Sequence, residues 1–289
     1  TISAVTSENP LQHPHHPPTS WDIFCRVIDN HGDLGVCWRL SADLAQRGHT
    51  VRLWVDDLSA LSWMAPQASS AQRGETPNFA PDIPTPSNVQ VMHWQDHTQA
   101  SSPHDVVVEA FGCELPEHFQ QLMAHAPHTV WVNLEYLSAE DYVARQHGLP
   151  SPVMHGPAKG ATKWFFYPGF SSDTGGLLRE SNLLQRQSAF DTTQWLQQWS
   201  FNKPLVADER LISLFCYEPE ALKDLLQQLA QDPTPTRLLV TAGRAQHAVR
   251  EVLPTLESNG SLTVEWLPYM NQTEFDHLLW ACDMNFVRG

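Results

Sequence analysis

The sequence predicts an α/β protein built from two doubly wound domains, and three observations predict it. Short β-branched runs alternate with helical segments from residue 21 onward, and a second series of the same kind starts near residue 205. The chain has 289 residues, of which 42% are hydrophobic, so it can bury two cores. Because ligands in open α/β sheets bind outside the carboxyl ends of the strands, we expect the chemistry in the turns that follow the strands.

The first domain is predicted to open on a strand, a polar turn, a helix and a second strand. Residues 21–28 are rich in Ile, Val and Phe, as is typical of a buried parallel strand, and the turn at 29–35 follows directly. A helix is expected over 36–47, with Gly48 as its stop, and residues 51–55 are the next strand. The turn at 29–35 therefore lies where a doubly wound domain binds its ligand.

Two later strands of this domain share one design, a β-branched run that ends near a carboxylate. The runs cover 105–111, which contains Glu109, and 129–135, which ends at Glu135. Two neighbouring parallel strands that direct acids to one edge of the sheet are the simplest interpretation. The remaining features are a strand at 89–93, long loops at 65–88 and 167–176, and a linking helix at 190–199.

The second domain repeats the alternation of strands and helices. Strands are expected at 211–216, 238–241, 262–267 and 284–287, and helices at 218–230, 245–256 and 272–281. The predicted division of the chain is a disordered tail, an N-terminal Rossmann-like domain, a linker and a C-terminal domain, at residues 1–20, 21–188, 189–204 and 205–289. Three histidines in the tail could bind a metal, but a solvated tail is the simpler interpretation because no carboxylate or cysteine surrounds them.

Charge and cysteine content narrow the class of protein. Seventeen basic residues against 32 acidic ones leave a formal net charge of −15, which argues against nucleic acid as a partner and favours cationic ones. The five cysteines form an odd set without a CxxC pair, which favours a reducing cytosol. No apolar run approaches the roughly 20 residues of a membrane helix, and no segment resembles a signal peptide. We therefore expect a soluble cytoplasmic protein that does not bind membranes.

Asp29 and Asp33 are the first candidates for chemistry because they follow the first strand. In an arbitrary sequence such acids are usually turn or helix-cap residues, but this location favours a functional role. A dinucleotide-binding dehydrogenase is one alternative, since Asp56 follows the second strand. Gly32 and Gly35, however, do not form the GxGxxG fingerprint that this alternative needs.

A long segment around these acids carries a family resemblance. Residues 24–40 read FCRVIDNHGDLGVCWRL. They resemble the N-terminal signature of the EarP family, the arginine rhamnosyltransferases of bacterial elongation factor P, and depart from it mainly at His31, where the family usually has an aromatic residue. Similar segments occur at 133–140, 168–171, 175–177 and 267–289. The resemblance therefore covers nearly all of residues 21–289.

The resemblance implies a GT-B arrangement, in which an N-terminal acceptor-side domain faces a C-terminal domain that binds the nucleotide sugar. It implies an inverting glycosyltransferase that moves L-rhamnose from dTDP-β-L-rhamnose to one arginine of elongation factor P, its protein partner, without a metal or a cofactor. The chain ends at Arg288-Gly289, directly after a predicted strand, whereas the family continues with a Glu-Asp-Ser that contacts the donor. We therefore expect the C-terminal domain to be incomplete in this chain.

The essential Asp pair of the family corresponds to Asp29 and Asp33. A guanidinium stays protonated at ordinary pH, so a carboxylate has to orient it and accept a proton. We assign Asp33 as the general base, and Asp29 as the residue that holds the guanidinium or positions the turn. Glu109 and Glu135 are candidate contacts for the acceptor arginine, with helix capping or exposed strand ends as the alternatives.

The donor site is also assigned through the resemblance. Aromatic rings and an amide suit a pyrimidine base, and an arginine at a strand end suits a diphosphate. The residues implied are Asn30, Gly35, Tyr217, Tyr269, Gln272, Phe275 and Arg288. Without the resemblance, the three at 269, 272 and 275 would be interpreted as a helix cap and two core aromatics, and the arginine as a surface residue.

Two other functions remain open. A GT-B transferase with a different acceptor shares every general feature of the sequence, and only the long turn that resembles the EarP signature argues against it. A noncatalytic nucleotide-binding module is the second alternative. The retained Asp29 and Asp33 argue against that module.

Overall fold

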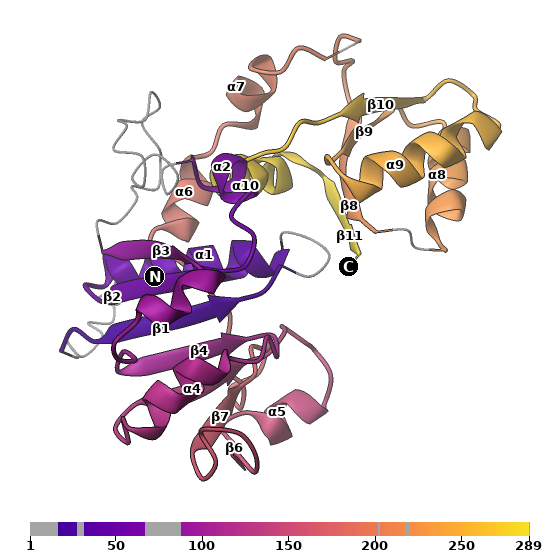
Figure 1. Ribbon diagram of the computed structural model, residues 1–289. Coiled ribbons are helices and arrows are strands. Elements are labelled where there is room, and N and C mark those ends of the chain that lie inside the picture. Colours follow the sequence, from indigo (N-terminus) through magenta and orange to yellow (C-terminus); the bar gives the residue numbers. More distant parts are fainter. Residues whose placement is uncertain (1–16, 28–31, 67–87, 202, 218–219, 289) are drawn as a thin grey trace, which may run out of the picture.

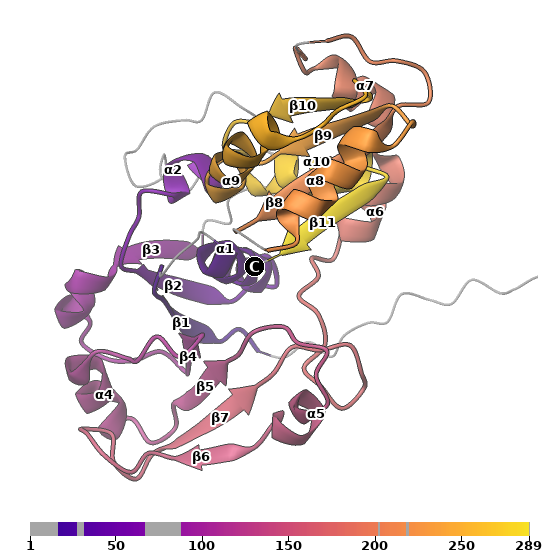
Figure 2. The same ribbon diagram turned by 90° about the vertical axis from the view of Figure 1, so that its right-hand side faces the viewer.

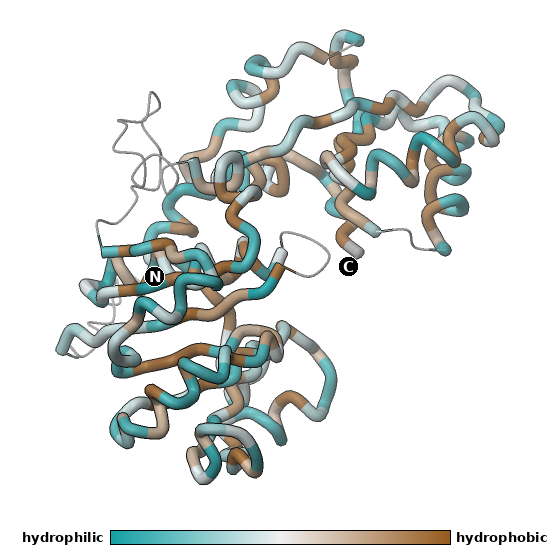
Figure 3. Tube along the Cα trace, viewed as in Figure 1, coloured by the Kyte–Doolittle hydropathy of each residue, from teal (hydrophilic) through white to brown (hydrophobic). Residues whose placement is uncertain are grey.

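The computed structural model describes residues 17–27, 32–66, 88–201, 203–217 and 220–288, and they form two separate α/β sheets (Figure 1). The first sheet has seven strands and the second has four. Most of the predicted tail and of the predicted loop at 65–88 lies outside the described residues. Figure 3 shows hydrophobic residues along the strands of both sheets, whereas the helices mix hydrophobic and hydrophilic positions, as expected where one side of each helix is buried.

The first sheet has the strand order β3-β2-β1-β4-β5-β7-β6. The pairs among the first six of these are parallel, and only β6 runs antiparallel, against β7. The strands are β1 Ser20–Cys25, β2 Thr50–Val55, β3 Val89–His93, β4 Val106–Ala110, β5 Val130–Leu134, β6 Pro150–Pro152 and β7 Thr162–Phe166. The chain order reverses between β1 and β4, so the crevice outside their carboxyl ends is the switch point of this sheet.

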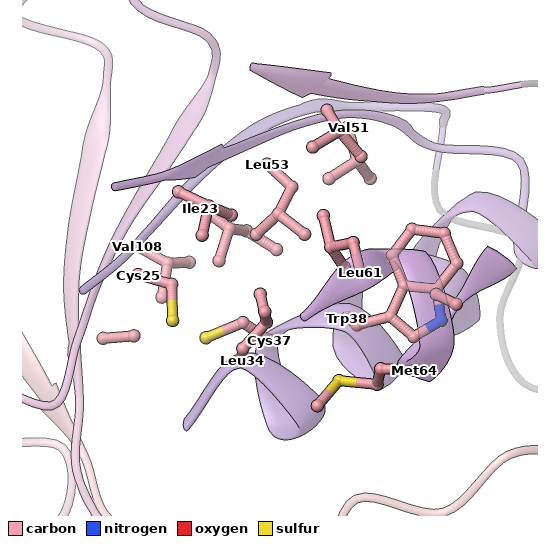
Figure 4. Packing of buried hydrophobic residues seen from close by; sticks show 14 of the residues in the cluster. Ile23, Cys25, Leu34, Cys37, Trp38, Val51, Leu53, Leu61, Met64 and Val108 are labelled. Atoms are coloured by element: carbon pink, nitrogen blue, oxygen red, sulfur yellow. The ribbon is translucent and has the colours of Figure 1, made fainter. Parts of the chain in front are cut away.

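Both faces of this sheet are covered by hydrophobic packing. On one face, α1 and α2 pack on β1 and β2 through a cluster that includes Leu34, Trp38, Leu53 and Leu61 (Figure 4). On the other face, α4 contributes Phe119 to a second cluster. The helical elements are α1 Gly32–Gln46, α2 Leu61–Met64, η1 Trp94–Gln99, α4 Glu117–Ala124 and α5 Tyr142–Gln146. The rigid sheet thus fixes where α1 begins, at the carboxyl end of β1.

The second sheet has the order β10-β9-β8-β11 with all pairs parallel, so its switch point lies between β8 and β11. Helices α8 and α9 cover one face and α7 and α10 the other (Figure 2). The strands are β8 Arg210–Cys216, β9 Thr236–Val240, β10 Leu262–Trp266 and β11 Met284–Arg288. The helical elements are α6 Leu183–Ala189, α7 Thr192–Gln197, α8 Leu222–Gln231, α9 Arg244–Val252, η2 Leu253–Thr255 and α10 Gln272–Ala281. The fold is the GT-B type that the sequence resemblance predicted.

Two local predictions differ from the structure in their bounds. The linking helix expected at 190–199 is present as the shorter α7, because Asp191 caps it by accepting a hydrogen bond from the Gln194 backbone and Phe190 is extended; the preceding helix α6 was not predicted. The turn expected up to residue 35 is also shorter, since α1 already begins at Gly32.

The described residues contain no helix long and apolar enough to cross a membrane. All five cysteines carry free thiols. Asp56, which the dehydrogenase alternative would use, instead accepts a hydrogen bond from the Val27 backbone N–H at 2.8 Å and ties the ends of β1 and β2 together.

Candidate active site

The two switch points face each other across the domains. The first turn of α1 follows β1, and Phe111 follows β4, on the two sides of the N-terminal switch point. In the other domain, Tyr217 follows β8, and Arg288 is the last residue of β11, paired with Cys216. Figures 1 and 2 both show β11 ending on the side of the second domain that is turned toward the N-terminal domain. The predicted base and the predicted donor site therefore lie on opposite sides of one interface.

Asp33 lies in the first turn of α1, half-buried at this interface. An acid in the first turn of a helix is stabilised by the helix dipole and by unpaired backbone N–H groups. Burial raises the pKa of its carboxyl above the ordinary value, while a hydrogen bond from Tyr136 Oη to Oδ2, at 3.1 Å, opposes that rise. A carboxylate in this environment is a stronger base than an exposed one and can accept a proton. Asp29 and Asn30 lie outside the described residues.

The burial and hydrogen bonds of Glu109 do not support its predicted role as a contact for the acceptor arginine. Its side chain is 2% exposed, and Oε2 accepts hydrogen bonds from Lys163 Nζ at 2.8 Å and Trp131 Nε1 at 3.0 Å. In β4 its side chain follows Val107 onto the face away from α1, because side chains alternate along a strand. The enclosed carboxylate of Glu109 balances the charge of Lys163 and holds the indole of Trp131. It has no exposed surface that an acceptor guanidinium could reach.

Glu135 remains a candidate acceptor contact. It follows β5, its side chain is half-buried, and Oε1 accepts a hydrogen bond from Asn133 Nδ2 at 2.6 Å. Its backbone N–H donates to the Phe166 carbonyl, which holds it at the carboxyl edge of the sheet. The carboxylate keeps capacity for further hydrogen bonds.

Three of the predicted donor residues surround the start of α10. Gln272 is the first residue of that helix, after an Asn271 cap that shares a capping box with Glu274. Tyr269 is 54% exposed, and its ring contacts that of Trp63 with 4.8 Å between centroids. Phe275 is partly buried against the core and meets Phe215 edge to face. This packing favours the alternative interpretation, in which Phe275 is a core aromatic residue.

Gly35 and Gln272 meet across the domain interface. A Cβ atom on Gly35 would lie 2.7 Å from Gln272 Nε2, so α10 can approach α1 this closely because the helix has a glycine there. The close approach explains why Gly35 is needed. It places the amide of Gln272 next to the helix that carries Asp33.

Tyr217 lies beneath the guanidinium of Arg244, with Cζ 5.3 Å from the ring centroid. Arg244 is the first residue of α9 and follows Gly243, whose φ of +98° suits glycine. An arginine at a helix N-terminus on the carboxyl edge of a parallel sheet is well placed for an anion. Sequence reasoning missed Arg244, although a Gly-Arg pair between a predicted strand and a predicted helix was a signal for it.

A buried charge cluster joins the domains, and sequence reasoning also missed it. Arg39 of α1 donates to both carboxylate oxygens of Asp276 on α10, at 2.9 and 2.8 Å, and to Glu180 at 2.7 Å. It also donates to Gln272 Oε1 at 3.4 Å, and Arg186 adds a contact to Asp276 at 3.4 Å. Burial disfavours the charged form of Arg39, but the hydrogen bonds to Asp276 and Glu180 outweigh it and raise the pKa of the guanidinium.

Known proteins are similar to this chain over nearly its whole length. The family model for the elongation factor P (EF-P) rhamnosyltransferase EarP matches residues 21–289. A protein-arginine rhamnosyltransferase of Pseudomonas putida is 42% identical over 284 residues, covering 93% of this chain and 71% of the relative. The Pseudomonas aeruginosa enzyme of the same name is 41% identical over 282 residues, covering 93% and 72%. A solved structure that explains EarP-mediated arginine glycosylation of EF-P is 30% identical, with a TM-score of 0.52, covering 94% of this chain and 67% of that one.

Proposed function

The chain belongs to the EarP family and is a protein-arginine rhamnosyltransferase, and from this premise we propose that it transfers L-rhamnose from dTDP-β-L-rhamnose to one arginine of elongation factor P with inversion. One observation carries the proposal. The half-buried carboxylate of Asp33 lies at the switch point of the N-terminal domain. It faces the C-terminal domain, which carries Tyr217 and Gln272. The five free thiols favour a reducing cytoplasm as the place of action.

The proposed reaction is a single displacement at the anomeric carbon. Asp33 accepts one proton from the acceptor guanidinium, which frees a nitrogen lone pair that a charged, delocalised guanidinium lacks. That nitrogen forms a bond to the anomeric carbon as the bond to the diphosphate oxygen breaks, and dTDP leaves with the electron pair. Attack opposite to the leaving group inverts the configuration. Asp29 would orient the guanidinium, because a carboxylate matches its planar fork.

The donor would bind on the C-terminal domain. Tyr269 offers an exposed ring for the base, and Gln272 an amide for its edge, while Arg244 at the start of α9 supplies positive charge for the diphosphate. The family resemblance assigns the same role to Arg288, whose backbone ends β11 and whose side chain lies outside the described part of the structure. This charge stabilises the leaving group, so we propose that the reaction needs neither a metal nor a cofactor.

Replacing Gln272 by alanine is expected to weaken dTDP binding roughly tenfold, since one hydrogen bond to a ligand contributes about 0.5–1.5 kcal/mol. The preference for thymidine over other nucleotides should fall as well. Calorimetric titration with dTDP and with UDP and GDP measures both effects. The matched control is Gln228→Ala, an exposed glutamine on α8 of the same sheet, which should bind as the wild type does. Unchanged affinity and selectivity of Gln272→Ala would make Gln272 a structural residue.

We expect the acceptor to be an arginine displayed by a folded protein. A carboxylate at the switch point recognises a guanidinium, which every arginine offers, so selectivity has to come from surface contacts around it. Catalytic efficiency should be highest for intact elongation factor P and its isolated arginine-bearing domain, and at least tenfold lower for a peptide with the same arginine. Intact-mass measurement of rhamnose transfer tests this. Equal efficiency for peptide and domain contradicts it, and an acceptor with lysine in place of the arginine is the negative control.

A further inference from the structure

Two aromatic residues stand at the N-terminal switch point, and the predicted site does not include them. Phe111 follows β4 and Tyr136 comes shortly after β5, and these two strands are neighbours. The Phe111 backbone N–H donates to the Leu134 carbonyl at 2.7 Å, which extends the pairing of the strands by one step. The two rings stack with 4.4 Å between centroids and 15° between planes. Both rings are therefore anchored to the carboxyl edge of the sheet.

Phe111 has an unusual backbone. Its φ is +55°, in the left-handed region that a bulky residue rarely adopts, and Gly112 continues the turn with a φ of +66°. Such strain persists only where the surroundings impose it, and it gathers at functional sites. The strained residue here carries the ring that stacks on Tyr136.

Tyr136 is held at its hydroxyl as well as at its ring. The side chain is 52% exposed, so burial of apolar surface does not account for its fixed position. Its hydroxyl donates to Asp33 Oδ2 at 3.1 Å. Burial, and then the negative charge of Asp33, raise the pKa of Tyr136 to about 12, so the phenol keeps its proton and remains a donor near neutral pH.

We propose that Tyr136, held by the ring of Phe111, is a positioning residue for the Asp33 carboxylate. Its hydroxyl binds Oδ2 and thereby directs Oδ1 toward the interface, where the acceptor guanidinium gives up its proton. Partial burial disfavours the ionised form of the Asp33 carboxyl, and the hydrogen bond from Tyr136 offsets part of this effect. The bond therefore helps to keep Asp33 ionised and able to accept a proton. This inference rests on the proposed function, in which Asp33 is the base.

The test is Tyr136→Phe, which keeps the stacked ring and removes the hydroxyl. We expect kcat to fall about tenfold, because one hydrogen bond to a charged group is lost, while the KM for the donor stays unchanged. The hydrogen bond lowers the pKa of Asp33, so its loss raises that pKa. Because the base has to be ionised, the acid limb of the kcat pH profile should move to higher pH. Tyr142→Phe is the matched control, a second exposed tyrosine that follows β5 and should behave as the wild type.

The outcomes separate this inference from the proposed function. A wild-type kcat and pH profile for Tyr136→Phe, beside an inactive Asp33→Asn, overturns the positioning role and leaves the base assignment standing. A lower kcat with an unmoved acid limb also overturns it, since a merely structural contact would behave in that way. An active Asp33→Asn overturns both. Phe111→Leu, which keeps the hydroxyl but removes its support, should lower kcat and leave the donor KM unchanged, and a wild-type kcat there contradicts the role of Phe111.

Discussion

Asp33→Asn is expected to cut turnover about 10²–10⁴-fold, the usual contribution of general base catalysis. The carboxamide has the size of the carboxylate and can still accept the hydrogen bond from Tyr136, so the fold and the first turn of α1 should persist. It cannot take a proton from a guanidinium at neutral pH. Rhamnose transfer to elongation factor P, followed by intact mass with saturating donor and acceptor, measures the effect.

The structure provides a matched control for this substitution. Asp224 is also an acid in the first turn of a helix, α8, and its side chain is exposed. Asp224→Asn should therefore reproduce any loss of helix-dipole stabilisation and leave turnover unchanged. Asp29→Asn should be severely impaired, if Asp29 orients the guanidinium. Turnover close to the wild type in both Asp33→Asn and Asp29→Asn would show that neither aspartate takes part in the reaction.

Arg39→Met is expected to produce the largest loss of stability. Methionine fills the space of the side chain stem but leaves Glu180 and Asp276, which are 5% and 7% exposed, without their main positive partner. Removing one partner of a buried ion pair costs about 3–5 kcal/mol, because the remaining charge is desolvated and unpaired. The remaining guanidinium of Arg186, with its longer contact to Asp276, compensates only part of that. Turnover should fall too, because α1 carries Asp33 and α10 carries Gln272.

Urea unfolding of the variants, followed by tryptophan fluorescence and far-UV circular dichroism, measures the loss. Arg47→Met is the control, since Arg47 directly follows the same helix and pairs with Asp43 four residues before it, but is 44% exposed. Asp43 itself is buried, but water reaches the Arg47 side of this pair, so its loss should cost less than the loss of Arg39, which bridges two buried carboxylates. A double variant with Asp276→Asn should lose less than the sum of the two single losses, because the two residues share one interaction. Equal midpoints for Arg39→Met and Arg47→Met would contradict a stabilising role for the cluster.

Much of the fold was predictable because its signals are local. The runs at 105–111 and 129–135 are β4 and β5, and the helix predicted at 272–281 has these same bounds in the structure. The start of that helix is marked in the sequence by Asn271 and Glu274, because a capping box needs only two residues three positions apart. In contrast, the short strands β6 and β7 were missed, because β6 consists of Pro-Ser-Pro and carries no hydrophobic alternation.

Glu109 marks the limit of that local reasoning. The sequence placed a carboxylate near the end of a strand, but the face onto which it projects depends on the register of β4 with its neighbours. The structure directs it toward Lys163 and Trp131, away from α1.

By itself, the sequence determined the alternation of strands and helices, the turn with its acids, and through these the family and the enzyme class. Only the tertiary structure decided which groups meet. Tyr136 contacts Asp33 across 103 positions, and Arg39 contacts Asp276 across 237. The physical reason is range: hydrophobic periodicity and capping act over a few residues, whereas these contacts depend on the order of strands in a sheet and on the packing of one domain against the other.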